Sequence, residues 1–322
     1  MLKRYLLTIF IAVLIAFALS KNFQKFIVTP EETVFNLKHD YSSIAKTLND
    51  NRNQIDENPS PIASPPLSPM STSIDQKKNY NKLQTSMKKY LAKQQGTYGV
   101  YFLDLTEGQR MGLNANKNFI AASTIKVPIN LYLYSMYSKN KFSIDDTVTY
   151  MESDYEEGTG DIQSDDFGNT YSLRELSRLS IEVSDNVAIN MLSRYLDYEK
   201  VVEYMERLVN HAIPRDENVT TPRDMTLYLK SLLDLTQKHP KTHELLDFLL
   251  NTEYNDRIPL YLPPEVPIAH KIGNQTGAVH DAGIVFAQRP YILCLFSENV
   301  DEEAAPEVLA QISKMVYDYS QN

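Results

Sequence analysis

The chain has 322 residues, of which 43% are apolar, so it can bury the core of one large domain or of two small ones. Its net charge of -9 at pH 7 excludes the basic surface that nucleic-acid binding needs. The single cysteine, Cys294, excludes a disulfide framework and a thiolate metal cluster, and its apolar surroundings predict a packing role.

Residues 1–21 have the pattern of an export signal. Two positive charges, Lys3 and Arg4, precede an uncharged apolar run that ends at Ser20. The run is shorter than the roughly 20 residues of a membrane span, which favours a cleaved signal peptide with an A-x-A site at 16–18. The lysines that follow favour an uncleaved membrane anchor instead. Both interpretations predict an extracytoplasmic protein, either secreted or held at the cell membrane by this segment.

Residues 22–78 are predicted to form a disordered stalk. From about 48 onward they are rich in proline, serine, asparagine and charge, and they contain too few apolar residues to fold. A proline-rich segment stays extended, so it would hold a domain away from the membrane surface. The folded domain is therefore predicted to span residues 79–322.

The rest of the chain carries the periodic patterns of a folded domain. Apolar residues at helical spacing predict a helix near 83–91, and strand-like runs on both sides of the turn at 106–108 predict a hairpin. Residues 123 to about 250 are mostly helical in pattern, and three strand-like runs and a last helix over about 301–319 follow. This order predicts an α+β fold, in which an antiparallel sheet built from both chain ends packs against an inserted all-helical half.

Ser123 and Lys126 stand three residues apart at the start of an apolar helical stretch. Residues at this spacing lie on one face of a helix, so the amine comes within reach of the hydroxyl. A serine needs a base to take its proton as it attacks, and a lysine can be that base once burial lowers its pKa from about 10.4. Taken alone, the spacing is also explained by a helix cap followed by a lysine whose ammonium group reaches the surface.

Two further motifs favour the catalytic interpretation. Residues 184–186 read S-D-N at the junction of two helical runs, and residues 271–273 read K-I-G at the end of a strand-like run. The order S-x-x-K, S-D-N, K-[T/S]-G resembles the class A β-lactamases and the penicillin-binding proteins. The resemblance covers about residues 79–320, and it implies a β-lactamase/transpeptidase-like catalytic domain with its site between the sheet and the helical half.

The resemblance implies four catalytic residues. Ser123 would be the nucleophile that accepts the acyl group, and Lys126 would be its base. Ser184 would pass a proton to the leaving nitrogen. Lys271 would attract a substrate carboxylate and, by repulsion across the site, keep Lys126 neutral.

It also implies four substrate-binding residues: Asn186, Ile272, Gly273 and Asn274. Asn186 would hold the amide of the substrate's side chain, and the backbone N–H of Asn274 would form an oxyanion hole with that of Ser123. Ile272 departs from the family pattern, because it has no hydroxyl to donate to a substrate carboxylate. No cofactor or metal site is predicted, since the histidines have no partners at ligand spacing.

A second departure concerns the release of the acyl group. The resemblance implies a glutamate in an E-x-x-L-N motif that activates water, and residues 206–210 come close to it as ERLVN. The same residues also end an amphipathic helical pattern, YEKVVEYMERLV, which puts Glu206 on a solvated face. The helical interpretation is favoured, because the residues that would form the family's long loop are missing.

Three functions remain open at this point. The preferred one is an extracytoplasmic serine hydrolase that acts through a Ser123 acyl-enzyme on a β-lactam or a related amide or ester. The second is a penicillin-binding D-alanyl peptidase of cell-wall maintenance with slow deacylation, which would take a peptidoglycan-derived substrate. The third is a non-hydrolytic β-lactam binding module.

Overall fold

The computed structural model describes residues 80–322. The predicted signal peptide or anchor at 1–21 and the predicted stalk at 22–78 lie outside the described residues. Among the residues that are described, no helix combines the length and the apolar character needed to cross a membrane.

The helices are α3 (Asn81–Leu91), α4 (Lys126–Ser138), α5 (Leu173–Glu182), α6 (Asn186–Leu196), α7 (Tyr198–Val209), α8 (Pro222–Lys238), α9 (Glu244–Leu250) and α10 (Ala305–Gln321), with 3₁₀ turns η1 (Ala122–Ile125), η2 (Glu152–Asp154), η3 (Ile162–Ser164) and η4 (Pro240–Thr242). The strands are β1 (Thr97–Asp104), β2 (Arg110–Leu113), β3 (Phe119–Ile120), β4 (Thr147–Thr149), β5 (Thr170–Ser172), β6 (Val219–Thr220), β7 (Ile268–Gln275), β8 (Ala278–Val285) and β9 (Tyr291–Glu298).

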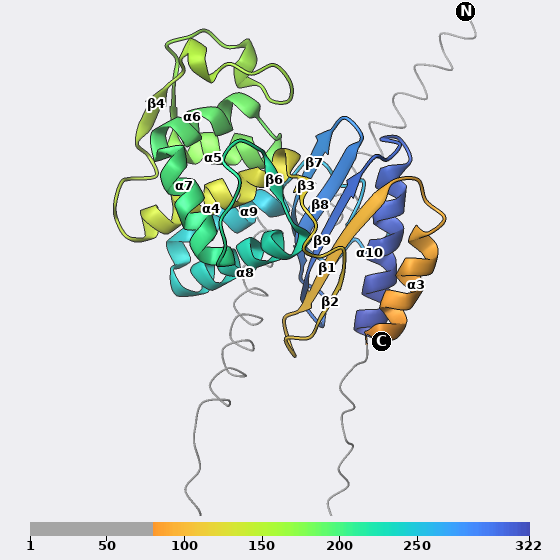
Figure 1. Cartoon of the computed structure of the whole chain (residues 1–322). Helices are drawn as coiled ribbons and strands as arrows, with labels where there is room; N and C mark the ends of the chain where they lie inside the picture. Colours follow the sequence, from red (N-terminus) through yellow and green to blue (C-terminus); the bar gives the residue numbers. More distant parts are fainter. Residues whose placement is uncertain (1–79) are drawn as a thin grey trace, which may run out of the picture. The chain divides into compact units, whose positions relative to one another are not determined.

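Five strands form one antiparallel sheet in the order β2-β1-β9-β8-β7. Strand β1 opens the sheet in the sequence and β9 closes it, yet they pair along their whole length, from Thr97 opposite Glu298 to Asp104 opposite Tyr291. Figure 1 shows them side by side, β1 in orange and β9 in blue. The predicted α+β fold, with a sheet built from both ends of the domain, is confirmed.

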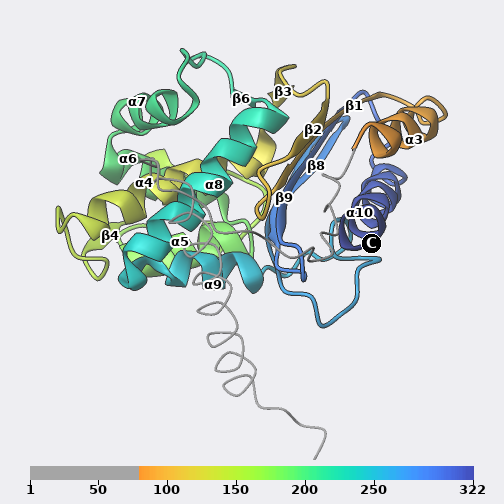
Figure 2. The ribbon, with the colours of Figure 1, turned by 90° about the horizontal axis from the view of Figure 1, so that it is seen from below.

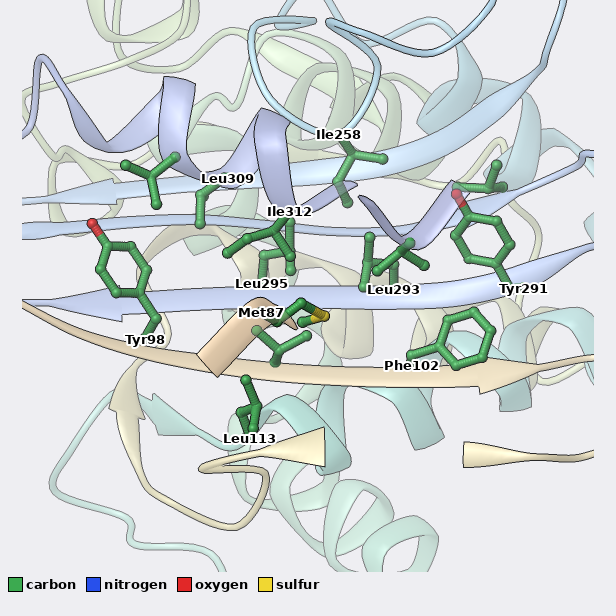
Figure 3. Close-up of a cluster of buried hydrophobic side chains, with 14 of the residues drawn as sticks. Met87, Tyr98, Phe102, Leu113, Ile258, Tyr291, Leu293, Leu295, Leu309 and Ile312 are labelled. Atoms are coloured by element: carbon green, nitrogen blue, oxygen red, sulfur yellow. The ribbon is translucent and has the colours of Figure 1, made fainter. Parts of the chain in front are cut away.

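Both faces of the sheet are covered. Helices α3 and α10 pack on one face and α8 packs on the other (Figures 1 and 2). Beneath α3 and α10 lies a cluster of buried apolar side chains, drawn in Figure 3, that includes Met87, Phe102, Leu293, Leu295, Leu309 and Ile312. Each side chain of this kind contributes about 1.5–3 kcal/mol when it leaves water. Cys294 lies within β9 and is fully buried, and burial raises the pKa of its thiol to about 12. A buried, protonated thiol is consistent with the predicted packing role.

Helix α4 is the centre of the helical half. Its first ten residues, from Lys126 to Ser135, are all buried, and helices α5, α6, α7, α8 and α9 all contact it. A helix that is covered on every side is mostly apolar, which is why this stretch shows no solvent-facing polar stripe in the sequence, although Lys126, Asn130 and Ser135 are among its buried residues. Lys126 is its first residue, so the fold carries this amine into the interior at the point where the helical half meets the sheet.

Two short ribbons were not signalled by the sequence. Strand β3 pairs with β6, and β4 pairs with β5. Strands of two or three residues are too short to show an alternating pattern, so periodicity cannot predict them. The β3–β6 ribbon matters for the site, because it joins the segment before Ser123 to the segment before α8.

His280 fastens this ribbon to the sheet. Its Nε2 donates to the carbonyl of Ile120 at 2.7 Å, and its Nδ1 accepts from the backbone N–H of Ser297 at 3.1 Å. Burial lowers the pKa of His280 to about 4, so the ring stays neutral and keeps both bonds at physiological pH. These two contacts give His280 a structural role.

Candidate active site

Ser123 lies in η1, a single 3₁₀ turn between β3 and α4. A 3₁₀ helix has three residues per turn, so positions three apart eclipse each other, and Lys126 follows Ser123 on the same side. Both residues line one cavity of about 590 Å³. Ala122, directly before the serine, has φ of 47°, in the left-handed region that costs an L-residue about 1–2 kcal/mol. The backbone is therefore strained next to the hydroxyl that the cavity exposes.

Lys126 is only 3% exposed and is held by three acceptors. Its Nζ donates to the backbone carbonyl of Ser184 at 2.6 Å, to the Ser184 hydroxyl at 3.2 Å and to Oδ1 of Asn186 at 2.8 Å. Burial lowers the pKa of Lys126 to about 8, while the charges of Asp185 and Glu156 oppose this shift. Roughly one lysine in ten is then neutral at pH 7, compared with fewer than one in a thousand for a solvated lysine.

The S-D-N residues form a tight corner before α6. Ser184 has φ of 60°, and its carbonyl also accepts from the Thr159 hydroxyl at 2.6 Å. Asp185 caps α6 by accepting from the N–H of Ala188 at 2.8 Å. Its other oxygen accepts from the N–H groups of Asp161 and Ile162 at 2.7 and 2.9 Å. One buried carboxylate therefore ties the loop over the cavity to the helix that carries Asn186.

Replacing Asp185 by alanine should destabilise the domain strongly. The variant loses a helix cap and leaves two further N–H groups in the interior without an acceptor, which together cost about 3 kcal/mol. Thermal unfolding should show a midpoint lower by roughly 6–12 °C for a domain of this size. Asp185→Asn keeps a good capping residue and should lose about half as much, whereas equal midpoints for all three proteins would contradict the anchoring role.

Lys271 approaches the site from the sheet. It lies in β7, is fully buried, and donates to the carbonyl of Ile272 at 3.3 Å. Burial lowers the pKa of Lys271 well below its ordinary value, the charge of Lys126 lowers it further, and Asp281 opposes both. Lys271 does not line the cavity, so it lies behind the surface that a substrate would touch.

Strand β7 presses its edge against the nucleophile turn. A Cβ added at Gly273 would lie 3.1 Å from the Ala121 carbonyl and 3.2 Å from the Ala122 Cβ, so glycine allows the close approach. The next residue, Asn274, is exposed and lines the same cavity as Ser123. Ile272 is buried and outside the lining, so this position of the third motif presents no side chain to the cavity.

Arg257 is a buried cation that no sequence motif signalled. Its Nη2 donates to Oδ1 of Asn274 at 2.7 Å and its Nη1 to the carbonyl of His280 at 2.6 Å. Burial lowers its pKa, and the charges of Asp256 and Asp281 oppose that shift. With its Oδ1 occupied, the side-chain amide of Asn274 turns its N–H donors away from Arg257.

Glu206 lies outside the cavity that Ser123 and Lys126 line. It stands in the last turn of α7, forms an ion pair with Arg215, and accepts from the backbone N–H of Ile213 at 2.9 Å. These contacts, led by Arg215, lower the pKa of Glu206 to about 2, and the residue does not line the cavity. From the short segment between α7 and β6, only Asn218 reaches the lining.

Other lining residues come from α6 and from the acidic loop. Asn186, Asn190 and Ser193 share one face of α6 at helical spacing, a pattern that the sequence does contain. Glu156 also lines the cavity, beside α6, and accepts from Nδ2 of Asn190 at 2.8 Å. It belongs to the acidic segment 152–166, in which no local signal separates it from the other acidic residues. Within residues 80–322, no three His, Cys, Asp or Glu side chains are grouped to hold a metal ion.

Comparisons with known proteins agree with this geometry. The family model described as "Beta-lactamase enzyme family" matches residues 82–320. A β-lactamase of Bacteroides uniformis is 28% identical over 247 residues, which cover 66% of this chain and 82% of that protein. A β-lactamase of Bacillus subtilis (strain 168) is 25% identical over 249 residues, which cover 68% and 78%.

Solved structures are similar over about three quarters of the chain. The crystal structure of a β-lactamase from Sphaerobacter thermophilus DSM 20745 has a TM-score of 0.69 at 23% identity, covering 76% of this chain and 98% of that one. The structure of PBP-A also has a TM-score of 0.69, at 26% identity, covering 74% and 95%. A variant of PBP-A has been solved as an acyl-enzyme complex with penicillin G. Since the family model spans most of the chain, the protein belongs to the β-lactamase enzyme family and is a serine hydrolase of the β-lactamase-like class.

Proposed function

We propose that the protein opens β-lactams by forming an acyl-enzyme at Ser123 and that it releases the acyl group slowly. The observation that carries this proposal is that the base for acylation lies in the cavity, whereas the candidate base for deacylation, Glu206, does not. Ser123 and a lysine with a lowered pKa share the cavity, whereas Glu206 is committed to Arg215 outside it. Acylation therefore has a base beside the nucleophile, whereas the glutamate of the ERLVN stretch is not placed to activate water for deacylation.

The first step forms the ester bond to Ser123, breaks the C–N bond of the substrate and moves a proton from the Ser123 hydroxyl to the leaving nitrogen. Neutral Lys126 takes the proton of the Ser123 hydroxyl as the oxygen attacks the carbonyl carbon. Negative charge then develops on the carbonyl oxygen, where the N–H groups of Ser123 and Asn274 would stabilise it, with each donor contributing roughly 3 kcal/mol. Ser184, which accepts a hydrogen bond from Lys126 at 3.2 Å, would give its proton to the leaving nitrogen as the C–N bond breaks and would take one back from the protonated Lys126 along that hydrogen bond.

The substrate carboxylate would be recognised differently here than in relatives whose third motif, K-[T/S]-G, supplies a hydroxyl. Ile272 has no donor, but Lys271 and Arg257 lie behind this edge of the cavity and Asn274 stands on it. An approaching carboxylate would favour the charged form of Lys271, because opposite charges stabilise each other in a desolvated site. Binding of the substrate would therefore restore the positive charge that burial suppresses in the free enzyme.

The second step needs water and a base. On the side of the segment between α7 and β6, the lining offers Asn218, whose amide can hold a water molecule but cannot take its proton. Slow release favours a second candidate, a D-alanyl peptidase of cell-wall maintenance, since the same residues would cleave a peptide ending in D-Ala-D-Ala. The segment at 1–21 supports an extracytoplasmic location for either activity.

Intact-mass spectrometry with a fluorescent penicillin tests the proposal. Wild-type protein should gain one acyl group within minutes and keep it for hours, because no dedicated base activates the water. Glu206→Gln should behave identically, since Glu206 lies outside the cavity. Rapid return of the wild type to its free mass, together with a persistent adduct in Glu206→Gln, would overturn slow release and assign deacylation to Glu206. The absence of any adduct would contradict acylation itself.

A further inference from the structure

Glu156 places a carboxylate in the wall of the catalytic cavity. Its Oε2 accepts from Asn190 Nδ2 at 2.8 Å, and no ion pair joins it to a lysine, arginine or histidine among residues 80–322. The only cation in the described lining is Lys126, which three acceptors already hold. Among the described residues, the cavity therefore contains a carboxylate that forms no direct ion pair, although its charge acts on Lys126.

Glu156 lies beside α6, and the point at which it contacts this helix relates it to the side chain of the substrate. Asn186 gives its Oδ1 to Lys126, so its N–H donors remain for the carbonyl of a substrate amide. Asn190 stands one helical turn further on, about 6 Å along the axis, on the same cavity-lining face. Because Asn190 holds Glu156, the carboxylate lies one turn beyond the amide-binding position, on the side away from Ser184.

We propose that Glu156 makes this end of the cavity a subsite for a protonated amine on the acyl side chain of the substrate. The inference rests on the proposed acylation of Ser123, and it names the substrates that Ser123 prefers. An ammonium group close to the amide would reach the carboxylate while Asn186 holds the carbonyl. The asparagine bond to Oε2 leaves Oε1 to accept from that amine.

The size of the preference follows from the exposure of the carboxylate. Glu156 is open to solvent, so water and salt screen its attraction for a cation. We expect an amine-bearing substrate to acylate Ser123 about threefold to tenfold faster than its uncharged counterpart at low salt. The preference should shrink as ionic strength rises, because the pair is not buried.

A matched pair of penicillins provides the test. Benzylpenicillin and ampicillin differ by one α-amino group, which is largely protonated at pH 6.5. Second-order acylation constants for both compounds would be measured by intact mass on wild type, on Glu156→Gln and on Glu157→Gln, a control that removes the same charge from an exposed neighbour outside the lining. The quantity compared is the ratio of the two constants within each protein, which cancels any general effect of Glu156 on the reactivity of Lys126.

Wild type and Glu157→Gln should favour ampicillin, and Glu156→Gln should show a ratio near one. A ratio near one in the wild type, or a preference that survives in Glu156→Gln, would overturn the amine subsite while leaving acylation of Ser123 intact. Unchanged ratios combined with slower release of the acyl group in Glu156→Gln would also overturn it, and would point to Glu156 as a base. Failure of both penicillins to acylate any protein would contradict the proposed function, and the subsite with it.

Discussion

Replacing Ser123 by alanine should abolish the covalent penicillin adduct. The cavity exposes this hydroxyl beside a lysine with a lowered pKa, and no other lining residue combines a hydroxyl with such a base directly beside it on a 3₁₀ turn. The expected loss is the full acylation signal, because alanine has no atom that can form the ester bond. Intact-mass spectrometry after incubation with penicillin measures it, and peptide mapping of the wild-type adduct should place the acyl group on Ser123.

Ser184→Ala is the matched control for this experiment. It also removes one hydroxyl in hydrogen-bond contact with Lys126, but it leaves the nucleophile in place. We expect slower acylation with the adduct still formed, whereas Ser123→Ala should form none. Both variants should unfold at a temperature close to that of the wild type. An adduct that persists in Ser123→Ala would move the nucleophile elsewhere and end the acyl-enzyme proposal as stated.

The fold was predictable because its signals are local and regular. Strand β9 and helix α10 each carry an uninterrupted apolar pattern, and the hairpin of β1 and β2 is marked by a turn at Gly108, where φ is 67°. Chain order then suffices to predict a sheet from both ends with helices between them, which the structure confirms. The β3–β6 ribbon escaped prediction because two-residue strands show no period.

The site also contains residues that the sequence predicted and residues that it did not. The motifs named Ser123, Lys126 and Asn186, and the structure places all three in the lining of one cavity, together with Asn274. Arg257 and Glu156 were not predicted, because their places depend on contacts with residues distant in the sequence, Asn274 and Asn190. Contacts between residues that are far apart in the sequence produce no local motif, so one sequence alone does not reveal them.

The sequence alone does not show which of the two buried amines, Lys126 or Lys271, carries the proton. Mutual repulsion was expected to keep Lys126 neutral, and spacing alone cannot say which partner yields its proton first. Lys126 has three acceptors within 3.2 Å, whereas Lys271 has one, at 3.3 Å, and is fully buried. Hydrogen bonds to acceptors favour the charged form and burial disfavours it, so Lys271 loses its proton more readily than Lys126. Near neutral pH, the pair therefore carries its charge mainly on Lys126.

Replacing Lys126 by alanine should slow acylation of Ser123 by about 10²–10⁴-fold, the usual contribution of a positioned general base. In the wild type, acylation should rise with pH, because only neutral Lys126 can take the proton and its pKa is about 8. The rate constant should increase about tenfold from pH 7 to pH 9 and level off above that. The measurement is the second-order acylation constant with one penicillin across this pH range. Lys126→Ala should lose the rising limb as well as the rate.

Lys126→Arg separates the basic role of the lysine from its charge. A guanidinium stays protonated at every pH in the range, so this variant keeps a cation at the site but should remain as slow as Lys126→Ala, without a break near pH 8. Thermal unfolding of each variant shows whether the larger group has disturbed the site. A break near pH 8 that survives in Lys126→Ala would assign the titrating base to another group. In that variant Lys271 also loses a neighbouring positive charge, so its pKa must rise, and any residual titration from Lys271 should move to higher pH than in the wild type.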